Sequence, residues 1–164
     1  MPAPADGRSS VAAIDREAGT MRFERDLYGT PEQVFTAWTR PEHVSKWWDA
    51  TGKPLSNCAI DLRVGGRFSF AVQDHPEAAF AGVYREIVPG RRLVFDALGA
   101  VGTVELSRTK TGTRMVVEIT CASPEHMEQF VRMGVDRGTS ATMDNLVRYL
   151  GEEAIPTGQP ALAQ

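Results

Sequence analysis

Residues 30–48 read TPEQVFTAWTRPEHVSKWW, and this stretch determines how the first part of the chain folds. Thr30, Pro31 and Gln33 provide an N-cap, a proline at the first helical position and a capping-box glutamine, which together predict a helix start. Pro41 disfavours helical geometry at the preceding residue, so two short helices joined end to end are predicted. The chain has three tryptophans, all within this stretch. They could form a core anchor, a ligand wall or a partner-binding patch.

Strands are predicted on both sides of this stretch. Residues 21–27 alternate apolar and charged side chains, with Arg25 as the exception, which is the period of a half-buried strand. Residues 11–15 are expected to pair with it as a preceding strand. Between Cys58 and Cys121 the sequence indicates about five strands separated by short turns rich in glycine and proline, which is typical of an antiparallel meander.

A long helix is predicted near the C-terminal end. Ser123 and Pro124 provide a cap and a proline at the first helical position, and apolar residues then recur at helical spacing over about 25 residues. A curved antiparallel sheet buries one face only when another element packs against it, and this helix is the largest candidate. The predicted fold is therefore α+β, with the sheet wrapped round the long C-terminal helix and two short helices after the first strand.

Length and charge limit the classes of protein to which this chain can belong. A chain of 164 residues indicates one domain, expected over residues 11–151 between a flexible leader at 1–10 and a flexible tail at 152–164. The formal net charge is -3 with both signs interspersed, so no nucleic-acid surface is expected. The apolar runs are far shorter than the roughly 18 residues of a membrane span, so no membrane span is expected either.

Cysteine and histidine usage argues against a metal centre. The chain has two cysteines, Cys58 and Cys121, without CxxC spacing, and three scattered histidines. Free buried thiols and a cytoplasmic location are expected, with no metal site and no cofactor. No catalytic triad or dinucleotide-binding motif is present, so no catalytic residue is predicted. A monomer or a homodimer fits equally well.

Several segments in matching order resemble the SRPBCC (START-like, helix-grip) superfamily. They include W-T-x-P-E-x-x-x-x-W-W at 38–48 and D-L-R-V-G-G-R at 61–67, which are specific in combination, and the likeness runs from about Met21 to Leu150. More narrowly, the chain is similar to the branch named after homologues of the activator of the heat-shock-protein-90 ATPase. The resemblance implies an antiparallel sheet of about seven strands round the C-terminal helix, enclosing a deep apolar cavity.

One position departs from this pattern. Where such sequences often have Gly-Trp in the C-terminal helix, this chain has Gly138-Thr139. The missing tryptophan volume could enlarge the cavity, or Met133 or Met143 could refill it. Gly134 lies one turn earlier, and two glycines inside a helix disfavour it by roughly 2 kcal/mol relative to alanine. Close approach to the sheet and space for a ligand are both open explanations.

The candidate ligand-binding residues are those expected to face the interior. Trp47 and Trp48 point about 100° apart on a helix, so one should seal the core while the other lines the cavity mouth or the surface. Glu86 shares a strand face with Phe80 and Tyr84, so it faces inward if they do, unless it pairs with an arginine or ends the strand in solvent. The full candidate set is Trp38, Trp47, Trp48, Phe68, Phe70, Phe80, Tyr84, Glu86, Phe95, Phe130, Gly134, Gly138 and Thr139.

Three functions follow from the residues and the resemblance. The first is binding of a small hydrophobic or aromatic molecule by a carrier, sensor or sequestration protein. The second is an enzyme of the polyketide cyclase/dehydratase type, in which Tyr84, Glu86 and Arg137 give acid/base help. The third is a co-chaperone-like protein-interaction domain. The first is favoured because apolar candidates are plentiful, and a polar outer sheet face containing Arg67 and Arg85 argues against the third.

Overall fold

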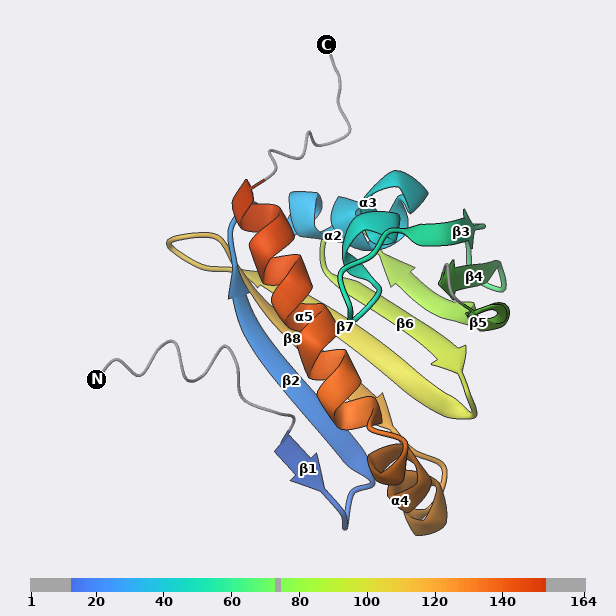
Figure 1. Cartoon of the computed structure of the whole chain (residues 1–164). Coiled ribbons are helices and arrows are strands. Elements are labelled where there is room, and N and C mark those ends of the chain that lie inside the picture. The colour runs from blue at the N-terminus through green and yellow to red at the C-terminus, as the bar shows by residue number, and fades with distance from the viewer. Residues whose placement is uncertain (1–12, 73–74, 153–164) are drawn as a thin grey trace.

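The computed structural model describes residues 13–72 and 75–152. Within this part of the chain, eight strands form one antiparallel sheet, and four helices complete an α+β fold (Figure 1). The leader predicted for residues 1–10 lies outside the described residues, as does the tail predicted for 152–164 apart from Glu152. No described helix is long and apolar enough to cross a membrane.

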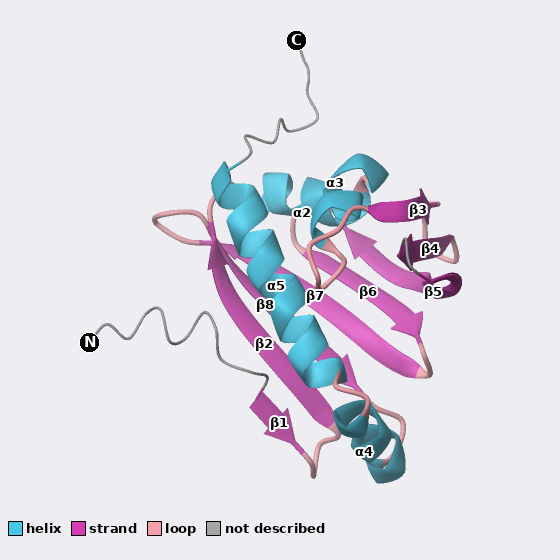
Figure 2. Ribbon diagram, viewed as in Figure 1, coloured by secondary structure: helices cyan, strands magenta, loops and turns pink. Residues whose placement is uncertain are grey.

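The sheet order places the first and the third strand of the chain at opposite edges, with the last strand beside the second. It runs β1-β2-β8-β7-β6-β5-β4-β3, so α2 and α3 carry the chain from β2 across to the far edge at β3. Figure 2 shows α5 crossing one face of this curved sheet. The strands are β1 (Ala13–Asp15), β2 (Thr20–Leu27), β3 (Leu55–Ile60), β4 (Arg67–Val72), β5 (His75–Val88), β6 (Arg92–Ala97), β7 (Ala100–Arg108) and β8 (Thr113–Thr120). The helices are α2 (Pro31–Thr39), α3 (Pro41–Trp47), α4 (Pro124–Arg132) and α5 (Val135–Glu152).

The helix signals of the opening stretch are confirmed atom by atom. The Thr30 hydroxyl accepts from the Gln33 N–H at 3.1 Å, and the Gln33 side chain accepts from the Thr30 N–H at 2.8 Å. Arg40 is extended at φ -109°, and Pro41 then begins α3. This corner between the two helices brings Trp38 and Trp47 together, with ring centroids 5.0 Å apart.

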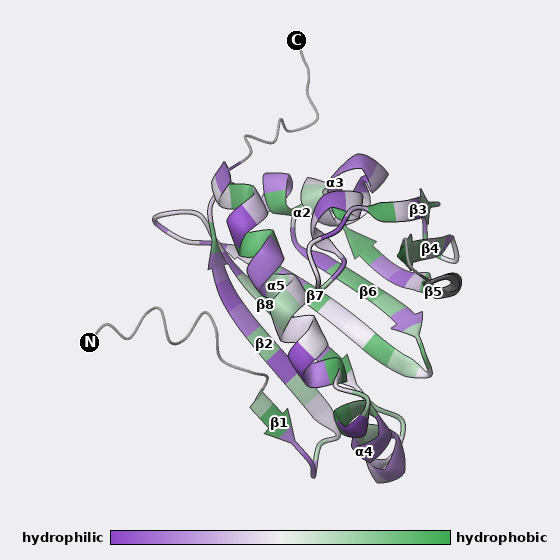
Figure 3. Ribbon diagram, in the orientation of Figure 1, coloured by the Kyte–Doolittle hydropathy of each residue, from purple (hydrophilic) through white to green (hydrophobic). Residues whose placement is uncertain are grey.

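Strand pairing follows the alternation of the sequence. The predicted first pair is confirmed, since β1 pairs with β2 in antiparallel register. The meander holds six strands where about five were predicted, because β3 and β4 are separate strands on either side of Gly65 and Gly66. Buried and exposed residues alternate along β2. Figure 3 shows hydrophobic and hydrophilic bands along the strands, although buried Arg25 interrupts the hydropathy alternation in β2. One sheet face therefore packs on α5, while the other carries charged side chains.

The predicted long C-terminal helix is confirmed as α5, but the prediction that it runs unbroken from Pro124 is wrong. The segment forms two helices, α4 and α5, divided at Gly134, whose φ is +79°. The Gly134 N–H donates to the Val131 carbonyl at 3.1 Å. Such a left-handed residue ends a helix, and glycine adopts the conformation without steric strain. Gly134 is thus explained by the break between the helices, and by neither of the two alternatives raised for it.

The core contains one buried cation. Arg25, the exception in the β2 alternation, is 3% exposed and contacts α5. Its Nε donates to Asp144 at 3.0 Å and its Nη2 donates to the Ser140 hydroxyl at 2.9 Å. A guanidinium whose N–H groups are hydrogen-bonded in this way can be buried. Arg25 therefore links α5 to β2 through hydrogen bonds.

Candidate functional site

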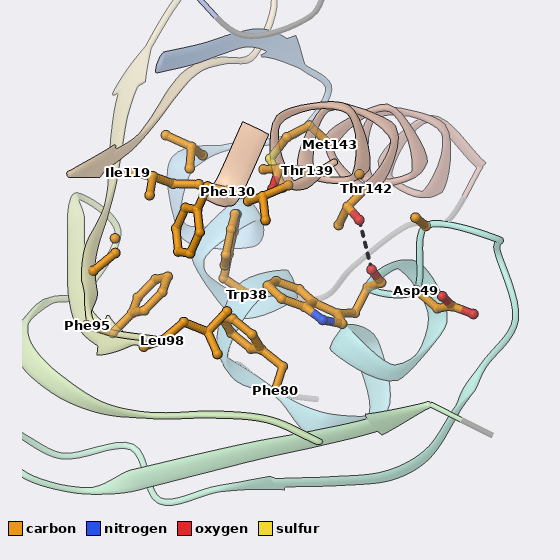
Figure 4. Close-up of a pocket in the computed structure, with 18 of the residues that line it drawn as sticks. Trp38, Asp49, Phe80, Phe95, Leu98, Ile119, Phe130, Thr139, Thr142 and Met143 are labelled. Carbon is orange, nitrogen blue, oxygen red and sulfur yellow. Dashed lines mark hydrogen bonds between the residues drawn. The ribbon is translucent and has the colours of Figure 1, made fainter. Parts of the chain in front are cut away.

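An apolar pocket of about 320 Å³ lies between α5, the sheet and the corner between α2 and α3 (Figure 4). Most lining side chains are aliphatic or aromatic, and the polar ones are Asp49, Thr139 and Thr142. In the described part of the chain, no group of three or more His, Cys, Asp or Glu residues is placed to hold a metal ion. The pocket is lined by Trp38, Trp48, Asp49, Ala50, Val72, Phe80, Phe95, Ala97, Leu98, Ala100, Gly102, Val117, Ile119, Phe130, Val135, Gly138, Thr139, Thr142 and Met143.

The three tryptophans divide between core and pocket. Trp47 is 1% exposed and its indole N–H donates to the Ala37 carbonyl at 3.1 Å, so it seals the core. Trp38 and Trp48 both line the pocket. The Trp48 carbonyl accepts from the Thr142 hydroxyl at 3.0 Å, which holds the end of α3 against α5. A core anchor and a pocket wall are therefore both present in one short stretch.

Three candidate aromatics lie beside the pocket without lining it. Phe68, Phe70 and Tyr84 are buried and pack around a void of only about 10 Å³, which is too small for a ligand. Burial, with a smaller contribution from Cys58, raises the pKa of the Tyr84 hydroxyl well above its ordinary value. Tyr84 therefore remains protonated at neutral pH, and these rings form a packed layer next to the pocket.

Glycines on neighbouring strands set the positions of two phenylalanine rings, those of Phe95 and Phe68. Phe95 faces Gly102 across the β6–β7 pair, and a Cβ added at Gly102 would lie 2.5 Å from the Phe95 ring. Phe68 and Gly82 form the same arrangement between β4 and β5, also at 2.5 Å. A bare backbone lets each ring lie against the neighbouring strand. Phe95 thereby becomes part of the pocket wall.

Glu86 does not face the interior. The register between β5 and β6 shifts between Tyr84 and Glu86, which indicates a β-bulge, so the parity that joined the two residues is lost. Glu86 is exposed, and its carboxylate accepts from the Arg92 Nε at 3.1 Å. The alternative of an arginine partner in solvent is therefore the one that the structure supports.

Both cysteines are free thiols in the structure. Burial, and to a lesser extent the charge of Glu42, raise the pKa of the Cys58 thiol to about 11. Burial also raises the pKa of Cys121. The nucleophilic form of cysteine is the thiolate, so neither side chain is activated at neutral pH.

The α5 side of the pocket contains the departure seen in the sequence. A Cβ added at Gly138 would meet nothing within 4 Å, so no close packing requires glycine there. Thr139 lines the pocket beside it, as does Met143. Met133 is 71% exposed and does not refill the space. Close approach to the sheet therefore does not explain Gly138, whereas Gly134 ends a helix.

Several lining residues were missed from the sequence. Thr142 lies one helical turn from Gly138 and Thr139, so helical spacing could have identified it. Leu98 has φ 55° in the turn between β6 and β7, and nothing in its residue type suggests that conformation. The missed residues are Asp49, Ala50, Val72, Ala97, Leu98, Ala100, Gly102, Val117, Ile119, Val135 and Thr142.

Comparison with known families identifies the family to which the chain belongs. Residues 29–151 match the family described as Activator of Hsp90 ATPase homolog 1-like protein. The chain belongs to this family. Among solved structures, the chain is similar to protein NE0264 from Nitrosomonas europaea, at 26% identity and a TM-score of 0.75 over 85% of this chain and 97% of that one. A search of curated proteins found no match.

More distant structures share the fold. A protein from Rhodobacter sphaeroides is 23% identical with a TM-score of 0.72, covering 87% of this chain and 97% of that one. Protein Ms6760 from Mycobacterium smegmatis is 18% identical with a TM-score of 0.74, over 87% of this chain and 97% of its own. These likenesses confirm the helix-grip architecture for a member of the Activator of Hsp90 ATPase homolog 1-like family. Fold alone does not define function, so the function must be argued from the pocket.

Proposed function

We propose that this chain binds a small, mostly apolar molecule in the pocket between the sheet and α5, as a carrier, sensor or sequestration protein. The observation that carries the proposal is the pocket itself, whose volume of about 320 Å³ falls in the range of small-molecule sites. Its walls are almost entirely apolar. Removing a ligand's apolar surface from water there is favourable by about 25 cal/mol per Å².

Gly138 supports this proposal independently. Glycine inside a helix costs about 1 kcal/mol relative to alanine, and open space beside this position shows that packing does not demand it. A residue that lowers helix stability without a packing reason is best explained by the space it leaves. That space belongs to the pocket.

The cyclase/dehydratase alternative receives less support from the site. Such an enzyme needs polar groups that converge on the substrate. Tyr84 is buried beside the pocket and Glu86 pairs with Arg92 in solvent, while Arg137 is exposed and does not line the pocket. The polar residues named for catalysis therefore do not meet at the pocket.

The protein-interaction alternative would be supported by an apolar outer sheet face. The strands there carry ion pairs instead, such as Arg114 with Asp26 at 2.7 Å and Arg85 with Asp96 at 3.4 Å. A surface of this kind is not the apolar patch by which interaction sites are usually recognised. We therefore favour the binding proposal over this one.

A series of substitutions at Gly138 tests the proposal. Alanine there should raise the stability of the protein, whereas leucine should lower its affinity for a ligand. Gly138→Ala should raise the free energy of unfolding by about 0.5–1 kcal/mol, since alanine favours a helix and its Cβ meets no neighbour. Gly138→Leu should keep a folded protein but place its side chain in the pocket. Affinity for naphthalen-1-ylmethanol, measured by isothermal calorimetry, should then fall at least tenfold, and urea unfolding gives the stabilities.

Gly151→Ala is the matched control. It changes glycine to alanine in the same helix, next to Tyr28 and away from the pocket, so affinity should not change. Equal affinity for the wild type and the folded Gly138→Leu variant would show that the ligand binds elsewhere. If the wild type bound no apolar probe, the proposed function would be wrong.

A further inference from the structure

We propose that the pocket selects molecules with an apolar body and a neutral hydrogen-bond-donating or positively charged head group, and rejects carboxylates such as fatty acids. This inference rests on the proposed function and narrows it to a class of ligand. It follows from the charges of the pocket lining. Among the described residues that line the pocket, Asp49 is the one ionisable side chain, and none is Lys, Arg or His.

Asp49 is held in place at the rim. Figure 4 shows it on the opposite side of the pocket from Phe95 and Leu98. Its carbonyl accepts from the Asn145 side chain of α5 at 2.9 Å, which fixes the segment that follows α3. Its carboxylate accepts from the Thr51 hydroxyl at 2.6 Å. Asp49 is one of the lining residues, so a ligand whose head group lies on this side of the pocket comes near its charge.

Among the described residues, no basic side chain neutralises the charge of Asp49. In the described parts of the chain, no Lys, Arg or His forms an ion pair with it, although Thr51 supplies hydrogen bonds. An ionised carboxylate has about four sites for accepting hydrogen bonds, so a ligand donor still finds an acceptor. A ligand ammonium group would both bond to the carboxylate and reduce its local charge.

The other polar groups at the pocket also suit a donor. The Thr142 hydroxyl already donates to the Trp48 carbonyl at 3.0 Å, so toward a ligand it can only accept, whereas the Thr139 hydroxyl can either donate or accept. The aromatic side chains of Trp48 and Phe80 lie in the same lining, and aromatic faces attract cations. Acceptors and ring faces together therefore match ligands that carry a hydroxyl or an amine.

A carboxylate ligand meets the reverse situation. Its charge would lie near that of Asp49, in surroundings less polar than water, where repulsion between like charges is stronger. No lining cation among the described residues would compensate for its loss of hydration. The anionic member of any set of ligands with one apolar body should therefore bind most weakly.

Three naphthalene compounds with nearly the same body test the inference. Naphthalen-1-ylmethylamine is cationic at pH 7, naphthalen-1-ylmethanol is neutral and 1-naphthoate is anionic. Isothermal calorimetry with the full chain should give dissociation constants at least tenfold lower for the amine and the alcohol than for the carboxylate. Asp49→Asn should weaken the amine at least threefold, leave the alcohol within twofold and narrow the gap to the carboxylate.

Asp61→Asn is the matched control, because it removes the same charge from an exposed ion pair with Arg63 away from the pocket. It should leave the order and size of all three affinities unchanged. Carboxylate binding equal to that of the alcohol would overturn the ligand class while leaving the proposed function intact, as would an amine preference unaltered by Asp49→Asn. If the wild type binds none of the three compounds at millimolar concentration, the proposed function fails together with the inference.

Discussion

Replacing Trp47 with alanine is expected to lower the free energy of unfolding by about 3–5 kcal/mol. The indole is 1% exposed, packs edge-to-face on Trp38 at 5.0 Å and donates to the Ala37 carbonyl. Alanine would leave a cavity where α2 and α3 meet and would remove that hydrogen bond. Urea denaturation followed by far-UV circular dichroism measures the loss, and Trp47→Phe, which keeps part of the volume, should lose less.

Trp48→Ala is the comparison that separates core from pocket. Trp48 is half-buried and borders existing open space, so its removal should cost less stability than the Trp47 change. It should weaken binding of an apolar ligand in the folded variant, because part of the pocket wall is lost. Equal stability losses from the two substitutions would contradict this division of roles between neighbouring tryptophans.

Arg25→Ala is expected to destabilise the protein by about 1.5–3 kcal/mol, because it removes the hydrogen bonds of a buried guanidinium, whereas the Asp144 carboxylate left behind is 35% exposed and can be hydrated. Asp144 would lose its guanidinium partner, and the Ser140 hydroxyl would lose the bond at 2.9 Å. α5 would also lose its polar attachment to β2. Chemical denaturation gives the stability difference, and Arg25→Met, which keeps much of the buried chain length, should be less harmful than alanine.

Arg22→Ala serves as the control on the same strand. Arg22 pairs with Glu24, and both side chains are about half exposed, at 48% and 45%. Exposed pairs of this kind contribute about 0–1 kcal/mol. If Arg25→Ala lowered the free energy of unfolding no more than Arg22→Ala, the contacts of Arg25 with Asp144 and Ser140 would not contribute to stability.

The fold was predictable wherever local signals and tertiary packing agree. Thr30 and Pro41 define helix starts by hydrogen-bonding capacity and by fixed backbone geometry, and both signals act within a few residues. The break at Gly134 is not predictable from the pattern, because apolar residues continue at helical spacing on both sides of it. The spacing alone does not report the backbone angle at the glycine, and the left-handed φ ended the helix.

The same limit applies to the strand faces. The inward position of Tyr84 was compatible with the alternation of the sequence, but the bulge before Glu86 changed the register and turned that side chain to solvent. A single extra residue in one strand leaves little trace in residue type. Strand parity is therefore dependable only between bulges.

The site was partly predictable because aromatics and interior glycines are visible as residue types. Trp38, Trp48 and Gly138 belong to this class, and all three line the pocket. Asp49 and Leu98 belong to connections between elements, whose course is set by tertiary packing. The small residues of the β6–β7 hairpin line the pocket through their position opposite α5, a property that depends on the assembled sheet.

The proposed function requires an apolar ligand to bind in the space beside Gly138 and Thr139. Intermolecular nuclear Overhauser effects in an isotope-labelled sample with bound naphthalen-1-ylmethanol test this most directly. We expect contacts from the naphthalene ring to the Thr139 methyl group and to the rings of Trp38 and Phe130, which line the pocket. A bound ligand with contacts only to the outer strand residues, and none to these three side chains, would contradict it.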